Sequence, residues 1–408
     1  MQVKPNVIGE GTYGCVHKPS IQCRNRTKKV KGKISKAMLD EEALIELREY
    51  AKIARADKKA DFYLGQPIKC KIRRSSENMN ALQKCKNGDE MINHLEDYSL
   101  LVMNDGGIDI EEYADFYHIA KNTEMNQRQI SRFLIEFQNV FQGTKVFLKH
   151  DIIQHDVKPQ NILYNEPRHR INFIDFGLMQ SYKKVMRTIR KSTYWLASRV
   201  HWSYPLEIRF LNWNKYMDYA RMTETEKMQE YHKDIEDLNE KNDTHFVNAI
   251  ETLFSFILPN DEKSAFTKRF FTDLHNSLLY DIEPGGKNFD EFAKKVLNTI
   301  DIYGIGIAVL YFANKVSHIL APKLYADLVE FGYHLITPDY KNRYEIDEAI
   351  SQYKKILHNN HIVKSKKGKW ISSVQSEMNE LGKRNFTLSR KMRDQNAATF
   401  TRSRYMKG

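Results

Sequence analysis

The segment QHDVKPQNILYNEPRHRINFIDFG, residues 154–177, contains two short apolar runs, at residues 162–163 and 171–174, separated by a polar turn. This pattern is typical of a β-hairpin. A polar loop ends directly before the first run, and Asp175 follows directly after the second. Because the two ends of a hairpin lie side by side, the loop and this aspartate are predicted to meet.

The polar loop, HDVKPQN, supplies Asp156, Lys158 and Asn161. Moving a phosphoryl group onto a hydroxyl requires a carboxylate near the hydroxyl proton, a cation for the transferred charge and a neutral oxygen ligand for magnesium. These three residue types are present at the D-x-K-x-x-N spacing. Asp175 leaves an apolar strand, where a lone carboxylate is costly to bury, so a metal ion is a natural partner for it. The simpler alternative for the loop is an ordinary polar turn.

A glycine-rich segment, GEGTYGCV at residues 9–16, lies between two predicted strands. Backbone amides at Gly9, Gly11 and Gly14 can approach a phosphate closely because no side chain intervenes. The segment precedes a strand rather than a helix, which favours a lid over phosphates and argues against a dinucleotide-binding fold. Alone, the motif is equally compatible with a flexible turn.

Residues 30–36 alternate in a period of two, so Val30, Gly32, Ile34 and Lys36 share one face of a predicted strand. A lysine on that apolar face needs a reason, and Lys33 is the alternative candidate for a functional lysine on this strand. Residues 39–56 follow a helical pattern, and Glu46 lies within its apolar stripe.

The helix is predicted to place one glutamate against this lysine. Glu46 is the first choice, because it shares the apolar stripe, and Glu49 and Glu42 are the alternatives. Each of the three is also compatible with an ordinary solvated position on a helix surface. A buried pair of this kind fixes the geometry of the lysine more than it adds net stability.

Strands come first and helices afterwards, which predicts an α+β chain with a small antiparallel β lobe and a larger α-helical lobe. The predicted boundaries are residues 1–103 for the β lobe with one long helix and 104–357 for the helical lobe. A helical insertion is expected at 208–300, where a T-x-x-E capping signal begins at Thr223 and an apolar run spans 246–258. The insertion is either a structural buttress or a docking surface. Residues 358–408 form a basic tail.

Charge and composition limit the other function classes. The net charge is +12, and the tail alone carries twelve Lys and Arg against three acidic residues, which leaves about +3 for the rest. Such a tail is either simply solvated or binds nucleic acid, an acidic protein or an anionic membrane surface. Neither a membrane-spanning run nor the apolar centre of a signal peptide is visible, so an intracellular, cytoplasmic protein is expected.

The four cysteines, Cys15, Cys23, Cys70 and Cys85, lack C-x-x-C spacing and the density of a disulfide scaffold. Free thiols in a reducing compartment are therefore expected, with no zinc held by the protein.

The glycine segment, D-x-K-x-x-N and D-F-G, in this order, resemble the eukaryotic-type protein kinase family. YPLE at residues 204–207 is similar to the A-P-E motif of that family, and DIYGIG at 301–306 is similar to the start of its central helix. Arg343 matches a late arginine that pairs with the A-P-E glutamate. The likeness extends from about Val7 to Leu357.

Some details resemble a narrower group, the serine/threonine kinases of large nucleocytoplasmic DNA viruses. These are GTYGCVHKPSIQC after the first glycines, ISKAM around Lys36 and HWSYPLE before the central helix. This resemblance implies a location in the host cytoplasm or the virion.

The resemblance implies roles for the residues. Asp156 is the catalytic base, Lys158 steadies the transferred charge, and Asn161 and Asp175 hold Mg²⁺ or Mn²⁺. Protein hydroxyls are the implied substrates, and Lys158, two residues after the base, is a serine/threonine feature. The remaining candidates are implied to contact ATP: Ile8, Gly9, Gly11, Tyr13, Gly14, Val16, Lys36, Met103, Asn104 and Asp105, with Asn104 and Asp105 offering backbone groups to the adenine. Lys36 is implied to contact the α and β phosphates, and Glu46 is implied to form an ion pair with Lys36.

Gln154-His155-Asp156 stands where kinases usually carry H-R-D. The missing arginine usually gathers a phosphate on the activation segment, and a histidine would hold that phosphate weakly near pH 7. Activity is therefore expected not to require activation-segment phosphorylation. The alternatives to a protein kinase are a pseudokinase that binds partners through the insertion and tail, and a small-molecule kinase of the same fold; Arg343 and YPLE favour a protein substrate.

Overall fold

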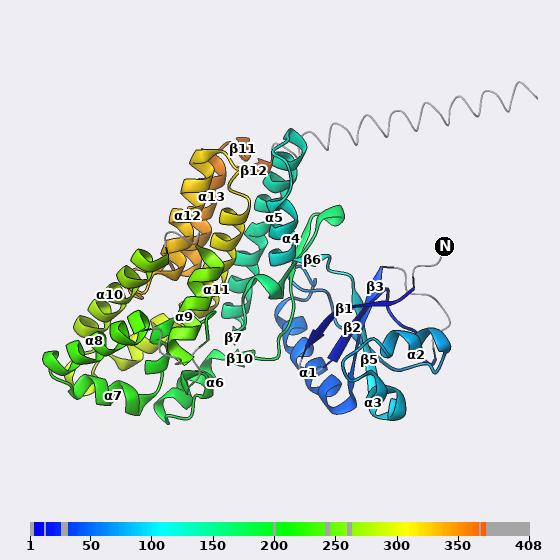
Figure 1. Cartoon of the computed structure of the whole chain (residues 1–408), viewed down its shortest axis with the longest axis horizontal. Helices are drawn as coiled ribbons and strands as arrows, with labels where there is room; N and C mark the ends of the chain where they lie inside the picture. Colours follow the sequence, from blue (N-terminus) through cyan, green and yellow to red (C-terminus); the bar gives the residue numbers. More distant parts are fainter. Residues whose placement is uncertain are drawn as a thin grey trace, which may run out of the picture.

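The computed structural model describes residues 4–11, 14–25, 32–198, 201–240, 245–258, 263–366 and 369–372. Figure 1 shows two lobes: the blue and cyan N-terminal part forms one, and helices form most of the other. The predicted α+β class, a small antiparallel sheet lobe followed by a larger helical lobe, is confirmed.

The sheet of the small lobe has five antiparallel strands in the order β1-β2-β3-β5-β4. These strands are β1 (Asn6–Gly11), β2 (Gly14–Lys18), β3 (Lys33–Leu39), β5 (Tyr98–Asn104) and β4 (Ile68–Lys71). The β3 strand pairs with both β2 and β5, so it occupies the centre of the sheet. Val30, part of the alternating pattern in the sequence, lies outside the described residues.

One long helix, α1 (Asp40–Ala56), follows β3 without a loop and buries Ala43, Tyr50 and Ile53, as the helical pattern predicts. Leu39 instead ends β3 and is 44% exposed. Three acidic residues in the first turn of α1 suit the positive end of its dipole.

Two short helices between β4 and β5 were not predicted: α2 (Ser76–Leu82) and α3 (Gly88–Asn93). The Ser75 side chain caps α2 by accepting a hydrogen bond from the Asn78 amide. Their apolar residues pack with Cys15, Ile72 and Leu100 in a separate cluster on the small lobe.

The prediction of free thiols is wrong. Cys15 is bonded to Cys85 and Cys23 to Cys70, and none of the four cysteines is free. The two bonded cysteines are 70 residues apart in the first disulfide and 47 in the second. The fold brings them together, and no local spacing in the sequence predicts either bond. Two disulfides do not fit a reducing compartment.

The large lobe is built around α11 (Phe289–Lys315), which packs against α4 (Ile110–His118), α5 (Glu124–Lys149) and α12 (Pro322–Ile336). The last long helix, α13 (Ile346–Asn359), packs on α5 and α12. In α11, 94% of an 18-residue window is buried within the lobe, although this helix is long and apolar enough to span a membrane. It is the core helix of the lobe, so no clear transmembrane segment emerges from the described residues.

The α11 helix begins at Phe289, twelve residues before the predicted start at Asp301. Phe289, Phe292, Ala293 and Val296 are buried at helical spacing, which extends the apolar face upstream into the insertion.

The insertion is helical, as predicted. It contains α7 (Trp213–Arg221), α8 (Glu224–Glu240), α9 (His245–Ile257) and α10 (Lys263–Asp281). At the start of α8 the Thr223 hydroxyl accepts from the Glu226 amide at 3.3 Å, and the Glu226 carboxylate accepts from the Thr223 amide at 2.7 Å. This reciprocal pair is the capping box that the sequence indicated.

Short strands lie between the lobes. A three-stranded sheet contains β6 (Ile108–Asp109), β8 (Ile162–Asn165) and β9 (Arg170–Phe173), and β7 (Ile152–Ile153) pairs with β10 (Gln180–Ser181). The remaining helix before the insertion is α6 (Tyr182–Arg190).

The chain continues past α13 with a hairpin of β11 (Val363–Lys366) and β12 (Lys369–Ser372). Most of the basic tail, residues 373–408, lies outside the described residues.

Candidate active site

The hairpin predicted in the sequence is β8 and β9, with Ile162 opposite Phe173. The amide of Ile174 donates to the Asn161 carbonyl at 3.0 Å, which extends the pairing to the end of the polar loop. The hairpin therefore brings Asp175 next to Asn161, although the two are fourteen residues apart in the sequence.

Asp156 lies at the centre of the polar loop and is only 7% exposed. The Lys158 ammonium donates to both of its carboxylate oxygens, at 2.8 and 3.0 Å. The Asn161 side-chain amide donates to the Asp156 carbonyl at 2.9 Å and to its carboxylate at 2.7 Å. These charge-assisted contacts fix the carboxylate in one orientation.

Asp175 is exposed, and its backbone adopts a left-handed conformation with φ of 55°. Its carboxylate has one long contact, from the Gly177 amide at 3.4 Å. The Asn161 amide nitrogen is engaged with Asp156, which turns its oxygen away from that carboxylate. A carboxylate and an amide oxygen at this junction fit a hard divalent cation such as Mg²⁺ or Mn²⁺.

Asp301 of α11 holds the start of the polar loop through hydrogen bonds to its backbone. Its two carboxylate oxygens accept from the backbone amides of Gln154 and His155, at 2.9 and 2.8 Å. Burial raises the pKa of Asp301 to about 6, against the opposing effect of these hydrogen bonds. A side chain at Gly304 would put its Cβ atom 1.8 Å from the Val157 carbonyl oxygen, so the loop rests directly on the helix backbone.

His155, at the position where kinases usually carry arginine, is buried and has a left-handed φ of 65°. Its Nδ1 atom faces the Leu178 carbonyl at 3.2 Å, and its Nε2 atom lies 2.8 Å from the Tyr194 hydroxyl. Nδ1 must therefore donate, and Nε2 accepts from Tyr194. Burial lowers the pKa of His155 to about 4, so the ring is neutral at physiological pH.

The neutral ring joins three segments: the catalytic loop, the residue after D-F-G and the stretch before the insertion. Motif reading did not identify Leu178 or Tyr194, because neither belongs to a local pattern. A buried histidine side chain needs hydrogen-bond partners, and this requirement is the one signal that could have pointed to Leu178 and Tyr194.

In the small lobe, the Lys36 ammonium contacts the Glu46 carboxylate at 2.6 Å, and both side chains are about one-fifth exposed. Lys33 instead contacts the side-chain oxygen of Asn104, and Glu49 pairs with Lys52 at 2.8 Å. Of the pairings considered from the sequence, the chain forms Lys36–Glu46.

Phe176 lies between α1 of the small lobe and α5 of the large lobe. Its ring packs edge-on against Tyr50 of α1 at 5.4 Å and against Phe147 of α5 at 6.2 Å. Burial raises the pKa of Tyr50, with further contributions from the nearby carboxylates of Glu46 and Asp175. The two lobes therefore meet at one aromatic cluster beside both groups of candidate residues.

The glycine-rich candidates lie on the β1–β2 hairpin. Ile8 is 53% exposed, and a Cβ atom built on Gly9 or Gly11 would meet nothing within 4 Å. Gly14 and Val16 are in β2, where Val16 pairs with Lys36 of β3. Tyr13 lies outside the described residues. The hairpin leaves open space beside its first two glycines, as a phosphate lid requires.

Met103 is buried in a small apolar cluster with Ile34, and Val16, Leu163 and Ile174 pack against this cluster from both lobes. The backbone of Asp105 is already engaged: its amide donates to the Gly32 carbonyl at 3.2 Å, and its carbonyl accepts from the Asn165 side chain at 3.2 Å. The structure therefore brings Met103 to the junction of the lobes but gives the Asp105 backbone other partners.

A buried ion pair joins the YPLE segment, residues 204–207, to Arg343 near the end of the large lobe. The Arg343 guanidinium contacts the Glu207 carboxylate at 2.6 Å, and both side chains are at most 1% exposed. Arg343 also donates to the Thr337 carbonyl at 2.8 and 3.1 Å. This is the pairing that the sequence indicated for these two residues.

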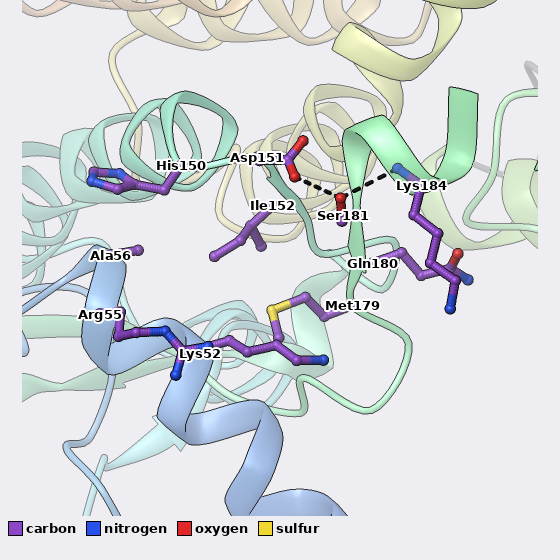
Figure 2. A pocket seen from close by; sticks show the side chains of 10 residues that line it. All are labelled: Lys52, Arg55, Ala56, His150, Asp151, Ile152, Met179, Gln180, Ser181 and Lys184. Carbon is purple, nitrogen blue, oxygen red and sulfur yellow. Dashed lines mark hydrogen bonds between the residues drawn. The ribbon is translucent and has the colours of Figure 1, made fainter. Parts of the chain in front are cut away.

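A separate cavity of about 330 Å³ is lined by the last turns of α1, by residues 150–152 and by residues from the segment 179–184. Figure 2 shows Arg55 and Lys52 of α1 on one wall and Met179, Gln180 and Ser181 on another. None of the candidate catalytic or nucleotide-binding residues lines this cavity.

Residues 107–199 match the family model described as the ABC1 atypical kinase-like domain. The match covers less than a quarter of the chain, but it contains the polar loop, the hairpin and D-F-G. Together with the two-lobed α+β fold, it supports a kinase-like fold and, in general terms, the use of ATP and a metal ion. The chain is a kinase-like protein.

Proposed function

We propose that this protein is a serine/threonine protein kinase that transfers the γ-phosphoryl group of ATP to protein hydroxyls. The observation that carries the proposal is the environment of Asp156: a carboxylate held by Lys158 and Asn161, with Asp175 delivered beside them by the hairpin. A structural loop has no need for a nearly buried carboxylate flanked by a lysine and a second, exposed carboxylate.

Asp156 orients the attacking hydroxyl and accepts its proton. Lys158, which contacts both oxygens of Asp156, also offers its charge to the transferred phosphoryl group. Its position two residues after the base favours serine or threonine as the acceptor.

The metal ion, when bound, neutralises charge on the phosphates and orients them for transfer. Asn161 and Asp175 are the residues that would hold it, because one presents an amide oxygen and the other a carboxylate with a single weak contact.

On the other side of the site, Lys36 holds the α and β phosphates and Glu46 orients its ammonium group. The β1–β2 hairpin covers the phosphates through Gly9, Gly11 and Gly14, with Ile8, Tyr13 and Val16 beside the nucleotide. Met103 backs the adenine, near Asn104 and Asp105.

The narrower likeness to the serine/threonine kinases of large DNA viruses is part of the same proposal. It rests on GTYGCVHKPSIQC, ISKAM and HWSYPLE in the sequence.

We also propose that activity is independent of activation-segment phosphorylation. The neutral His155 side chain already joins Leu178 to Tyr194, so the segment is held without a phosphate. Phosphatase treatment should leave activity unchanged, and its loss after treatment would contradict this part of the proposal.

The direct test incubates the purified chain with radiolabelled ATP, Mg²⁺ and generic basic and acidic protein substrates. The wild type should transfer label to serine and threonine. Asp156→Asn, which keeps the shape of the side chain but removes the base, should reduce the rate by about 10²–10⁴-fold.

The same label-transfer assay separates the kinase from the rival function, a pseudokinase. A pseudokinase would bind partners, and its residual signal would be equal in wild type and Asp156→Asn. If both proteins are folded and neither labels any protein substrate, the kinase proposal fails.

A further inference from the structure

Three potential metal ligands converge on the small lobe, away from the candidate active site. Cys15 and His17 lie two residues apart on β2, so their side chains share one face of the strand. Cys85 follows α2 and reaches the same point. The His17 Nε2 atom is 3.9 Å from the Cys15 sulfur and 3.6 Å from the Cys85 sulfur.

All three side chains are buried, and His17 is fully so. The Nε2 atom of His17 also lies 3.3 Å from the Ala81 carbonyl oxygen, whereas Nδ1 has no hydrogen-bond partner within the described part of the chain. A buried imidazole with one unpaired nitrogen, and with two sulfurs close to the other nitrogen, is unusual for a side chain that only fills space.

The second disulfide provides a contrast. Cys23 and Cys70 are bonded in the same lobe, but among the described residues the only cluster of possible ligand atoms within 4.8 Å of one another is Cys15, His17 and Cys85. The histidine therefore distinguishes one cysteine pair from the other.

We propose that Cys15, His17 and Cys85 form a Zn²⁺ site when the Cys15–Cys85 disulfide is reduced. An external dithiol supplies two electrons and two protons, which convert the disulfide to two thiols while the dithiol becomes a disulfide itself. Zinc binding then releases both thiol protons as two Zn–S bonds form. Nε2 of His17 is the third ligand, and the Ala81 carbonyl is a further oxygen donor.

The observed separations suit this ligand set. With Zn–S bonds of about 2.3 Å and Zn–N bonds of about 2.0 Å, tetrahedral geometry puts sulfur and nitrogen roughly 3.6 Å apart. The two sulfur–nitrogen separations are already 3.6 and 3.9 Å. Only the two sulfurs have to move apart, and the ring proton has to reside on Nδ1.

The same three side chains thus tether α2 to β2 in either chemical state. In an oxidising compartment the tether is the disulfide, and in a reducing one it is zinc. Since β2 continues from the glycine-rich turn, either tether fixes the base of that hairpin. The proposal does not depend on kinase activity.

The test uses the full chain, reduced with a dithiol without oxygen, incubated with Zn²⁺ and passed through a desalting column. Elemental analysis should find about one zinc per wild-type chain. The matched control is Cys23→Ser with Cys70→Ser, which removes the other pair and should keep about one zinc. Cys15→Ser with Cys85→Ser should retain less than about a tenth.

Cobalt provides a second readout that a structural change alone would not give. Reduced wild type loaded with Co²⁺ should show a thiolate-to-cobalt charge-transfer band, which His17→Ala should shift or abolish. Reduced, folded wild type that retains no zinc would overturn the proposal whatever the variants do. Equal loss of zinc in both double-serine proteins would also overturn it.

Discussion

The two sides of the candidate site are held in very different ways. In the large lobe, the catalytic loop is tied to α11 by both oxygens of Asp301, by the close approach at Gly304 and by the buried His155. In the small lobe, β1 is almost entirely exposed, and no atom of the described residues lies within 4 Å of a Cβ atom built on Gly9 or Gly11. Buried, mutually dependent contacts fix the loop of the large lobe, whereas the β1 strand of the small lobe has few buried contacts.

This difference matches what each side would have to do. A base must keep one orientation relative to the acceptor hydroxyl, and rigid elements achieve that best. A lid must open for a nucleotide to enter and leave, so few buried contacts suit it. The contrast predicts that substitutions in the large lobe change stability, whereas those in the small-lobe site change activity with little change in stability.

The largest effect is expected at Arg343. Arg343→Met leaves the Glu207 carboxylate buried without its partner, which should lower the free energy of unfolding by about 3–5 kcal/mol. Urea unfolding followed by fluorescence measures this change.

The matched control is Arg24→Met in the small lobe, because the Arg24–Glu96 pair is largely exposed. This variant should change stability by about 0–1 kcal/mol. Equal effects for the two arginines would break the comparison.

The second effect depends on pH. The pKa of His155 is about 4 in the folded chain, below the ordinary histidine value near 6.5. The native state therefore binds fewer protons than the unfolded state, so this contribution is full above pH 6.5 and is lost as pH falls towards 4. The stability advantage of wild type over His155→Asn should shrink by about 3 kcal/mol across that window.

Asparagine suits this test because it does not titrate and tolerates the left-handed backbone at this position. The buried Asp301, with its pKa raised to about 6, titrates in both proteins, so the difference between them isolates the histidine. Denaturant midpoints from pH 4 to pH 7.5 provide the measurement. A difference that does not vary with pH would show that His155 is not held neutral.

The third effect compares two glycines. Gly304→Ala forces a methyl group against the Val157 carbonyl, which should cost about 1–3 kcal/mol or more and disturb the catalytic loop. Gly9→Ala meets no atom within 4 Å and should leave the melting temperature within about 2 °C of wild type. Thermal unfolding of both variants provides the measurement. A larger drop in melting temperature for Gly9→Ala than for Gly304→Ala would contradict the comparison.

The smallest stability effect, with a large effect on activity, is expected at the lysine of the small lobe. Lys36→Met leaves Glu46, which is only about one-fifth exposed, without its partner and should lower the free energy of unfolding by about 1 kcal/mol. Phosphoryl transfer should nevertheless fall by at least about 10²-fold, since the lysine is proposed to hold the phosphates. Lys33→Met, on the same strand, should retain most activity; the reverse result would reassign the phosphate contact.

Much of the site was predictable because its residues follow local patterns. The D-x-K-x-x-N and D-F-G spacings encode a hairpin, and a hairpin fixes which loops meet. The choice of Lys36 over Lys33 as the partner of Glu46 followed from strand parity and the helical stripe, both of which are short-range properties. The lobe boundaries and the catalytic roles stay predictions.

What the sequence did not reveal depends on long-range packing. The disulfide between Cys15 in β2 and Cys85 after α2 joins residues 70 apart in the sequence, so it depends on how the small lobe packs. Tyr194 meets His155 only because the intervening segment folds back over the catalytic loop. Neither contact leaves a periodic trace, so no local pattern could have predicted it.

Because α11 starts early, one continuous helix runs from the insertion to Asp301, the residue that holds the polar loop. From Phe289 to Asp301 the helix rises about 18 Å without interruption, at 1.5 Å per residue. A force or a partner that tilts the outer end of this lever must therefore displace the carboxylate beneath the catalytic loop. A deletion within the insertion would therefore have to leave α11 intact from Phe289 onward, because this helix positions Asp301 against the polar loop.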